Sequence, residues 1–277
     1  MVEAAPVKNL LKRHLTPRQI ESLRKLFWAV GGFWYRSDLV RLAAFFQTDK
    51  WGDHRYAQHY QRYFAPLRRK NLHLLEIGVG GYANLGLGGN SLRMWKAYFR
   101  KGQIFGIDIY DKRAFEEPRI KIFQGSQEDE RFLRQAVKSM GGVDIVVDDG
   151  SHMNAHVLKT FDVLFPLLNE QGIYVVEDTQ TSYWPRFGGS SDRLGDADTI
   201  MGYFKKLADG LNYEEQIRPG YLPTYFDKKI SAIHFYHNLI FIFKGDNSEG
   251  SNTLTNNQVR AGTALAVDQP ASSSTLR

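Results

Sequence analysis

The sequence predicts an α/β fold: a doubly wound, mostly parallel seven-stranded sheet with flanking helices and an antiparallel C-terminal hairpin. Short apolar segments alternate with helical patterns from residue 72 to residue 176, and several of them end in glycine or acidic residues. Two further apolar segments between 230 and 244 are only two residues apart, which is hairpin spacing. The chain has 277 residues, of which 43% are hydrophobic, and this is enough for one domain with a full core.

Residues 1–70 predict a helical extension. Thr16-Pro17-Arg18-Gln19 combines a capping residue, a first-turn proline and a capping-box glutamine, so we expect a helix to begin there. Gly31-Gly32 is expected to interrupt that helix, and a second helix is expected from about Ser37.

Residues 71–245 predict the alternating domain. Strands are expected at 72–77, 103–109, 120–124, 143–147 and 172–176, and helices at 91–99, 128–140, 155–168 and 197–212. His237-Asn238 joins the expected hairpin strands 230–236 and 239–244. The polar segment 246–277 predicts a disordered tail.

Composition excludes several classes of function. The chain has no cysteine, which rules out disulfide scaffolds, zinc–thiolate sites and thiol catalysis. Residues 1–50 hold nine Lys/Arg and four acidic residues, but no nucleic-acid-binding motif accompanies this charge, and no nucleic-acid partner is predicted. Charges interrupt the apolar stretch 26–46, so no transmembrane segment is predicted, while membrane-surface contact and a homo-oligomer stay open. Without a signal-peptide pattern, we expect a cytoplasmic location.

A glycine-rich turn, Glu76-Ile77-Gly78-Val79-Gly80-Gly81, follows the first expected strand. Ligands of an open parallel sheet bind beyond the carboxyl ends of its strands, and glycines let the backbone approach them closely. The spacing is not GxGxxG, and a long loop follows instead of a helix, which disfavours a pyrophosphate. Glu76 suits a cationic ligand with an amino group, and Asp108, at the end of the second strand, can accept two ribose hydroxyls. The pattern favours S-adenosylmethionine.

Two acidic pairs, Asp148-Asp149 and Glu177-Asp178, follow the fourth and fifth expected strands. Adjacent parallel strands lie about 4.8 Å apart, so these carboxylates are expected to crowd together, which is costly unless a cation neutralises them. Oxygen ligands favour Mg²⁺ or a similar ion. His152 is expected beside this ion as the general base that deprotonates a hydroxyl, although a role as ligand or substrate partner stays open.

Together these segments resemble the metal-dependent O-methyltransferases that modify sugar hydroxyls of glycosylated natural products, such as the macrolide-sugar methyltransferases. The matching segments are LEIGVGGY (75–82), GGNSLRMWKAYF (88–99), IFGIDIYDK (104–112), VDDGSHMN (147–154) and VVEDTQTSY (175–183), with TDKWGDHRYAQHY (48–60) upstream and IHFYHNLIFIFKG (233–245) downstream. The resemblance implies a Rossmann-like methyltransferase sheet, S-adenosylmethionine and Mg²⁺ as cofactors, and a small-molecule glycoside, glycolipid or other hydroxylated acceptor.

The resemblance also implies individual roles. His152 would be the catalytic base, and Asp149, Glu177 and Asp178 would bind the metal. The cofactor would be surrounded by Tyr56, Glu76, Gly78, Gly80, Gly81, Asn90, Asp108, Ser126, Gln127 and Asp148. A lid over the acceptor is expected at 183–189. The best-known macrolide-sugar members carry a further N-terminal domain, whereas about 70 residues precede the first expected strand here.

Three other functions are weighed against this one. A metal-dependent methyltransferase of a catechol or another small phenol would use the same residues. A non-catalytic, cofactor-binding scaffold would need neither the acidic pairs nor His152. A nucleic-acid methyltransferase is suggested only by the sequence pI of about 9.3.

Overall fold

The computed structural model describes residues 16–260, and the expectations for 1–15 and 261–277 lie outside the described residues. The helices and strands, in chain order, are α2 (Pro17–Tyr35), α3 (Leu39–Phe46), α4 (Ala57–Phe64), η1 (Ala65–Leu67), β1 (His73–Ile77), α5 (Asn90–Tyr98), β2 (Gln103–Asp108), η2 (Arg113–Phe115), β3 (Ile120–Gln124), α6 (Glu130–Met140), β4 (Val143–Asp148), α7 (Asn154–Leu164), β5 (Leu168–Glu177), η3 (Thr179–Tyr183), η4 (Pro185–Phe187), α8 (Ile200–Gly210), η5 (Tyr213–Glu215), α9 (Tyr225–Lys229), β6 (Ile230–Tyr236), β7 (Leu239–Lys244), β8 (Leu254–Thr255) and β9 (Gln258–Val259).

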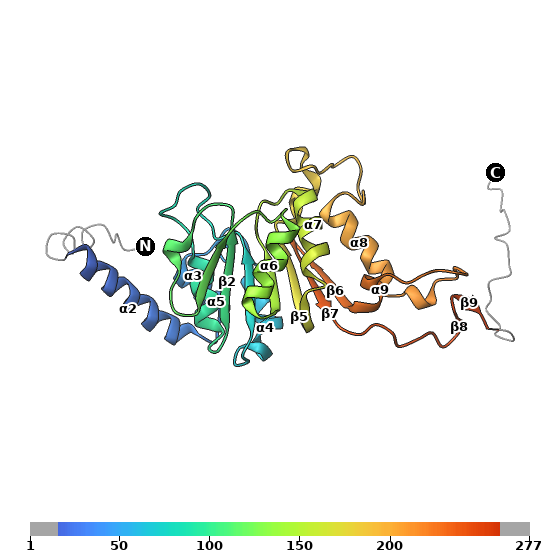
Figure 1. The fold of residues 1–277 in the computed structure, drawn as a ribbon, viewed down its shortest axis with the longest axis horizontal. Helices are drawn as coiled ribbons and strands as arrows, with labels where there is room; N and C mark the ends of the chain where they lie inside the picture. Colours follow the sequence, from blue (N-terminus) through green and yellow to red (C-terminus); the bar gives the residue numbers. More distant parts are fainter. Residues whose placement is uncertain (1–15, 261–277) are drawn as a thin grey trace, which may run out of the picture.

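The main sheet has seven strands in the order β3-β2-β1-β4-β5-β7-β6 (Figure 1). β1 to β5 are parallel, and β7 is antiparallel to both β5 and β6. This confirms the predicted fold class, including the antiparallel hairpin. The chain adds β2 and β3 on one side of β1 and β4 on the other, so strand order reverses between β1 and β4, where such sheets bind ligands.

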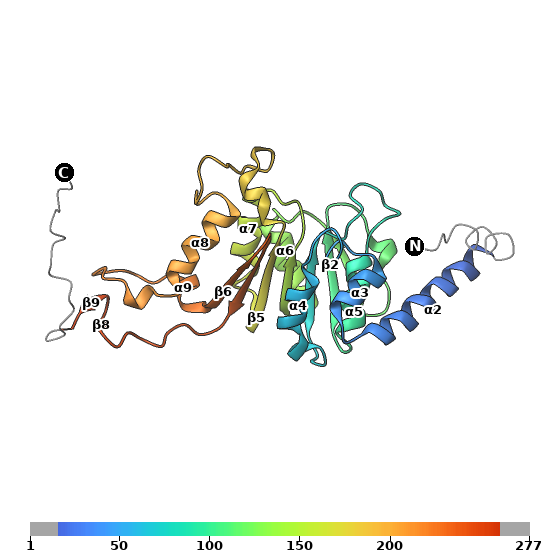
Figure 2. The ribbon, with the colours of Figure 1, turned by 180° about the vertical axis from the view of Figure 1, so that it is seen from behind.

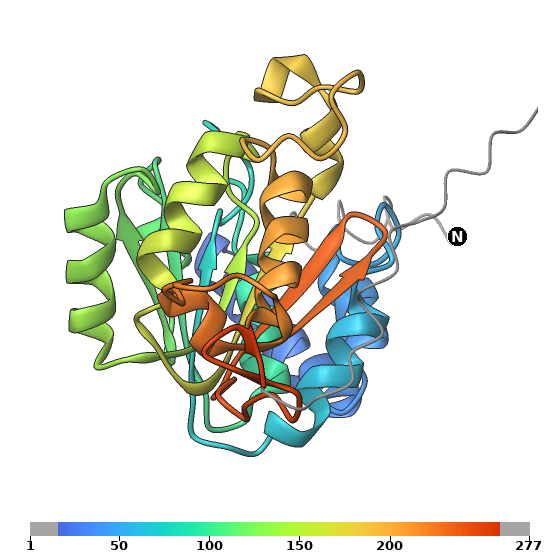
Figure 3. The same cartoon turned by 90° about the vertical axis from the view of Figure 1, so that its right-hand side faces the viewer.

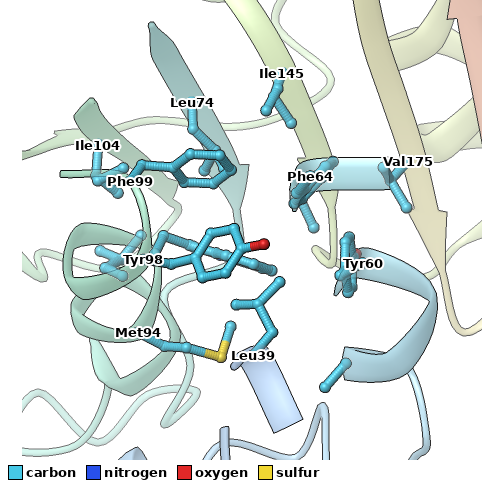
Figure 4. Packing of buried hydrophobic residues seen from close by; sticks show 14 of the residues in the cluster. Leu39, Tyr60, Phe64, Leu74, Met94, Tyr98, Phe99, Ile104, Ile145 and Val175 are labelled. Carbon is cyan, nitrogen blue, oxygen red and sulfur yellow. The ribbon is translucent and has the colours of Figure 1, made fainter. Parts of the chain in front are cut away.

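Helices cover both faces of the sheet (Figure 3), and each face has its own apolar cluster. Side chains alternate between faces along each strand, so Leu74 and Leu75 of β1 enter different clusters. α3, α4 and α5 cover the face that contains Leu74, and α6, α7 and α8 cover the face that contains Leu75. Figure 4 shows Tyr60, Phe64 and Phe99 in the first cluster, where the ring centroids of Phe64 and Phe99 lie 5.5 Å apart. The helices before residue 71 therefore share one core with the strands.

Helix α2 corrects the prediction of a break at Gly31-Gly32, because it continues through both glycines to Tyr35. A Cβ on Gly31 would lie 2.0 Å from the ring of Phe45, and one on Gly32 would lie 3.1 Å from the Cβ of Ala97. The glycines let α2 pack closely on α3 and α5, and this contact offsets their low helix propensity of about 1 kcal/mol each. The rest of α2 extends away from one end of the sheet (Figures 1 and 2).

Other elements differ in extent from the prediction. Helix α4 was not expected, although Ala57, Tyr60 and Phe64 are buried at helical spacing. α7 ends at Leu164, and β5 begins at Leu168, earlier than expected, because Leu168 pairs with Val143 before an irregularity in the ladder. Within the polar segment, 246–260 includes the short pair β8 and β9, which the sequence did not predict. Among residues 16–260 no helix has the length and apolar character needed to cross a membrane.

Candidate active site

The glycine turn after β1 passes close to the segment after β4. Gly78, Gly80 and Gly81 have φ values of 88°, 84° and 78°, which glycine adopts most easily. A Cβ on Gly78 would lie 2.1 Å from the carbonyl oxygen of Asp149, and one on Gly81 would lie 2.3 Å from that of Leu87. Glycine is therefore required at both positions, and it holds the turn at the crevice between β1 and β4.

A cavity of about 1220 Å³ opens at this crevice. Predicted site residues that line it are Gly78, Gly80, Gly81, Asn90, Asp108, Ser126, Gln127, Asp149, His152 and Asp178. Tyr56, Glu76, Asp148 and Glu177 do not line it and are each at most 2% exposed. Pockets for one small ligand measure about 300–1,000 Å³, so this cavity has room for two molecules side by side.

Asp108 and Gln127 fix loops that border the cavity. Asp108 accepts hydrogen bonds from the backbone N–H groups of Val79 and Tyr110, both at 2.9 Å. An ionised carboxylate has about four acceptor positions, so Asp108 can still accept hydroxyl donors. The side chain of Gln127 accepts from the N–H of Ser151 at 2.8 Å and donates to Asp148 at 3.3 Å, which links the loops after β3 and β4.

Asp148 is fully buried behind this wall. Burial raises the pKa of Asp148 to about 7, although the hydroxyl of Tyr174 donates to it at 3.1 Å and thereby opposes the shift. Asp148 therefore stabilises the loop after β4 through its hydrogen bonds with Gln127 and Tyr174.

Asp149, His152 and Asp178 meet at the other side of the cavity. Each offers a ligand atom, and these atoms all lie within 4.8 Å of one another. His152 Nε2 lies 3.6 Å from Asp178 Oδ2 and 4.0 Å from Asp149 Oδ1. Two carboxylates and an imidazole at one cavity wall fit a divalent cation by the chemistry of the donor set.

Two of these three residues hold an unusual backbone. His152 has a φ of 58° and Asp178 a φ of 53°, in the left-handed region that side-chain-bearing residues seldom occupy. Such conformations cost about 1–3 kcal/mol each and cluster at functional sites. They turn both side chains toward the same wall of the cavity.

Glu177, predicted as a metal ligand, is buried and does not line the cavity. Its Oε1 accepts hydrogen bonds from Lys50 Nζ at 2.8 Å and from the hydroxyl of Tyr60 at 2.5 Å. Glu177 is not a member of the group whose ligand atoms lie within 4.8 Å of one another. The structure therefore brings Asp149 and Asp178 together with His152, and Glu177 is joined to Asp149 through Lys50.

Lys50 is a site residue that the sequence analysis missed. Its ammonium is fully buried, 2.8 Å from Asp149 and Glu177 and 3.2 Å from Glu76. Burial by itself lowers the pKa of Lys50, but attraction by these three carboxylates outweighs it and raises the pKa well above its ordinary value. Lys50 is therefore a fixed positive charge within the acidic cluster.

His54 and Tyr56 reach the same cluster. The hydroxyl of Tyr56 donates to Asp178 Oδ1 at 2.7 Å, and His54 Nε2 lies 3.4 Å from the same oxygen. The two rings stack at a centroid distance of 4.6 Å. Tyr56, predicted near the cofactor, contacts Asp178. Lys50, His54 and Tyr60 all belong to the segment 48–60, whose resemblance was the signal that could have found them.

Part of the segment predicted to be a lid, 183–189, lies at the cavity. Arg186 and Phe187 line it, while Trp184 is half exposed. Asn154, at the start of α7, donates to the carbonyl oxygens of Thr181 and Phe187 at 3.1 and 2.8 Å. This side chain fastens the lid segment to the helix layer.

Comparison with known proteins gives the following similarities. No family model matches the sequence. The chain is 46% identical over 211 residues to the 8-demethyl-8-alpha-L-rhamnosyl tetracenomycin-C 2'-O-methyltransferase of Streptomyces olivaceus, covering 76% of this chain and 55% of that protein. It is 45% identical over 217 residues to the mycinamicin VI 2''-O-methyltransferase of Micromonospora griseorubida, covering 78% and 54%. The chain thus spans about half the length of the curated relatives it matches.

Comparison with solved structures also finds a similar methyltransferase. The MycE methyltransferase from the mycinamycin biosynthetic pathway, in complex with Mg and SAH, superposes with a TM-score of 0.75 at 45% identity. The match covers 77% of this chain and 55% of that one. A second structure of MycE, with Mg, SAH and mycinamycin VI, superposes with a TM-score of 0.74.

Proposed function

This chain is a homologue, over about three quarters of its length, of O-methyltransferases that modify glycosylated natural products, and on that basis we propose that it has their activity. It would transfer a methyl group from S-adenosylmethionine to a sugar hydroxyl of a glycosylated small molecule, with Mg²⁺ or a similar ion at the site. One observation carries the proposal. A single cavity joins the glycine turn and Asp108 on one side to Asp149, His152 and Asp178 on the other.

The proposal assigns the two sides of the cavity to two ligands. Gly78, Gly80 and Asp108 would hold the cofactor, and Asp149 and Asp178 would hold the ion, with Glu177 as the proposed third carboxylate. When bound, S-adenosylmethionine supplies an electrophilic methyl group, and the divalent ion lowers the pKa of a hydroxyl that it binds. The room left in the cavity would accept the sugar, beneath Arg186 and Phe187.

His152 is the proposed general base. Its Nε2 lies at the wall formed by Asp149 and Asp178, so a hydroxyl held there would be within reach of the ring. Asp149 and Asp178 would therefore hold the ion, and a hydroxyl bound to it, close to the base.

Chelation tests the metal in this proposal. We expect EDTA to abolish methyl transfer from S-adenosylmethionine to a rhamnosylated acceptor, and added Mg²⁺ to restore it, because the ion would orient and acidify the hydroxyl. The measurement is methylated product by mass spectrometry, with calorimetric binding of S-adenosylhomocysteine as the control for an intact fold. Full activity in the chelator would overturn the metal role, and methylation of a catechol but of no glycoside would overturn the sugar acceptor.

A further inference from the structure

Lys50 lies between two helices whose backbone holds it in place. Its carbonyl oxygen accepts a hydrogen bond from the N–H of Ala57, at the first residue of α4, at 3.0 Å. On the other side, the N–H of Thr48 bonds to the carbonyl oxygen of Ala43 in α3, also at 3.0 Å. The side chain then passes through the core to the strand ends and is 0% exposed. Hydrogen bonds to α3 and α4 on either side of Lys50 in the sequence therefore fix the position of its backbone.

The ammonium of Lys50 joins carboxylates from three different strands. Glu76 belongs to β1, Asp149 follows β4, and Glu177 ends β5. Glu76 and Glu177 are buried, and like charges buried this close together are costly without a cation. One ammonium is in contact with all three, so it is the cation that holds this cluster together.

Other buried lysines of the described chain are bound differently. Lys112 donates to the carbonyl oxygens of Asn84 and Leu87, and Lys244 donates to those of Pro166 and Leu168. Those partners are neutral, whereas each partner of Lys50 at the strand ends is a carboxylate. Lys50 therefore differs from Lys112 and Lys244, because its ammonium binds charged partners and does not only satisfy backbone carbonyl groups.

Lys50 also connects the residues beneath the glycine turn to the proposed metal site. Glu76 lies beneath the glycine turn, with Ser91 of α5 donating to it at 2.7 Å, and Asp149 is one of the proposed metal ligands. A divalent ion bound at Asp149 would stand close to an ammonium of the same sign. The two cations would then compete for the charge of the same carboxylates.

From these contacts we infer that Lys50 is a positioning residue, the resident counter-cation of the acidic cluster, which holds the carboxylates together without metal and lowers their affinity for a divalent ion. The inference rests on the proposed metal site. It assigns no contact of Lys50 with either substrate, and its effect passes through Asp149 and Glu177.

The test measures Mg²⁺ binding in the full chain. Lys50→Met, purified in Mg²⁺ and then exchanged into chelator, is expected to unfold at a lower temperature than wild type, and saturating Mg²⁺ is expected to restore most of the loss. By calorimetry with Mg²⁺ alone, the variant should bind about tenfold more tightly or better, since one repelling charge is gone. Lys244→Met is the matched control, because it also removes a buried ammonium but should lose the same stability with and without Mg²⁺.

A second variant covers the case in which Lys50→Met does not fold. Adding Glu177→Gln removes one carboxylate with the ammonium, so the double variant should regain metal-free stability. Equal destabilisation of Lys50→Met with and without Mg²⁺, or Mg²⁺ binding no tighter than wild type, would overturn the inference and leave the proposed function intact. If Mg²⁺ binds to neither wild type nor variant, the metal part of the proposed function fails along with the inference.

Discussion

His152 and Asp178 adopt a left-handed backbone conformation that glycine adopts more easily. Their φ values of 58° and 53° bring the imidazole and the carboxylate to the same cavity wall. Tyr56 and His54 hold Asp178 there. The cost of about 1–3 kcal/mol for each residue is therefore offset by neighbouring contacts.

Two substitutions of His152 distinguish the contribution of its imidazole to catalysis from the energetic cost of its left-handed backbone. His152→Ala should lower kcat by about 10²–10⁴-fold, the usual contribution of a general base, and leave S-adenosylhomocysteine affinity nearly unchanged. His152→Gly should be equally inactive but about 1 kcal/mol more stable than His152→Ala, because glycine relieves the left-handed strain. Kinetics, calorimetry and urea unfolding check these results, with His234→Ala, exposed on β6, as the control. Unaltered kcat would exclude His152 as the base.

At the residue scale, the pattern of strands and strand ends predicted the acids and glycines but could not predict Lys50. Asp149, Glu177 and the glycine turn follow apolar strands, and parallel strands bring their ends to one edge. Lys50 lies between two helices, 99 residues from Asp149 and 127 from Glu177 along the chain. No periodicity connects residues so far apart, and a lysine next to Asp49 in a polar segment resembles a solvated surface charge.

Helix α2 shows how packing changes the meaning of a residue at the scale of one element. The sequence could supply its start, since Thr16 and Gln19 form the capping box that the pattern predicts. The sequence could not show that α2 continues through Gly31-Gly32, because glycines lower helix propensity but also let a helix approach its neighbour closely. Only the position of Phe45 on α3 decides between the two effects.

Gly31→Ala provides the test of this packing. Alanine favours the helix by about 1 kcal/mol, but its Cβ would lie 2.0 Å from the Phe45 ring. We expect a net loss of about 1–3 kcal/mol in the free energy of unfolding, the range for overpacked cores. Urea unfolding followed by circular dichroism measures it, and in a Phe45→Leu background the same change should be tolerated. A stabilised Gly31→Ala single variant would contradict the contact.

At the scale of the whole molecule, Asn154 joins the predicted lid segment, 183–189, to the helix layer. It bonds to Thr181 and Phe187, and its side-chain oxygen accepts the N–H of Ile200, the first residue of α8, at 2.7 Å. The side chain is 1% exposed, so the lost bonds would leave buried backbone groups unpaired.

Asn154→Ala should therefore loosen the lid and lower the stability of the fold. We expect a loss of about 2–4 kcal/mol on unfolding by urea, from several unpaired buried groups at about 1–3 kcal/mol each. Limited trypsin digestion should cleave faster after Arg186 and Arg193. Asn169→Ala is the control, because that amide bonds to Asp144 at an exposed position. Unchanged digestion and stability in Asn154→Ala would show that the lid is held by other contacts.

The strand order also has a consequence for how this chain is completed during synthesis. β5 pairs with β7, the later strand of the hairpin, and within residues 16–260 β6 pairs only with β7. A ribosome that has made β6 has therefore produced a strand with no partner, beside a β5 whose edge is still open. Completion of the sheet must wait for residues 239–244, and until then a chaperone or a second nascent chain could pair with the open edge.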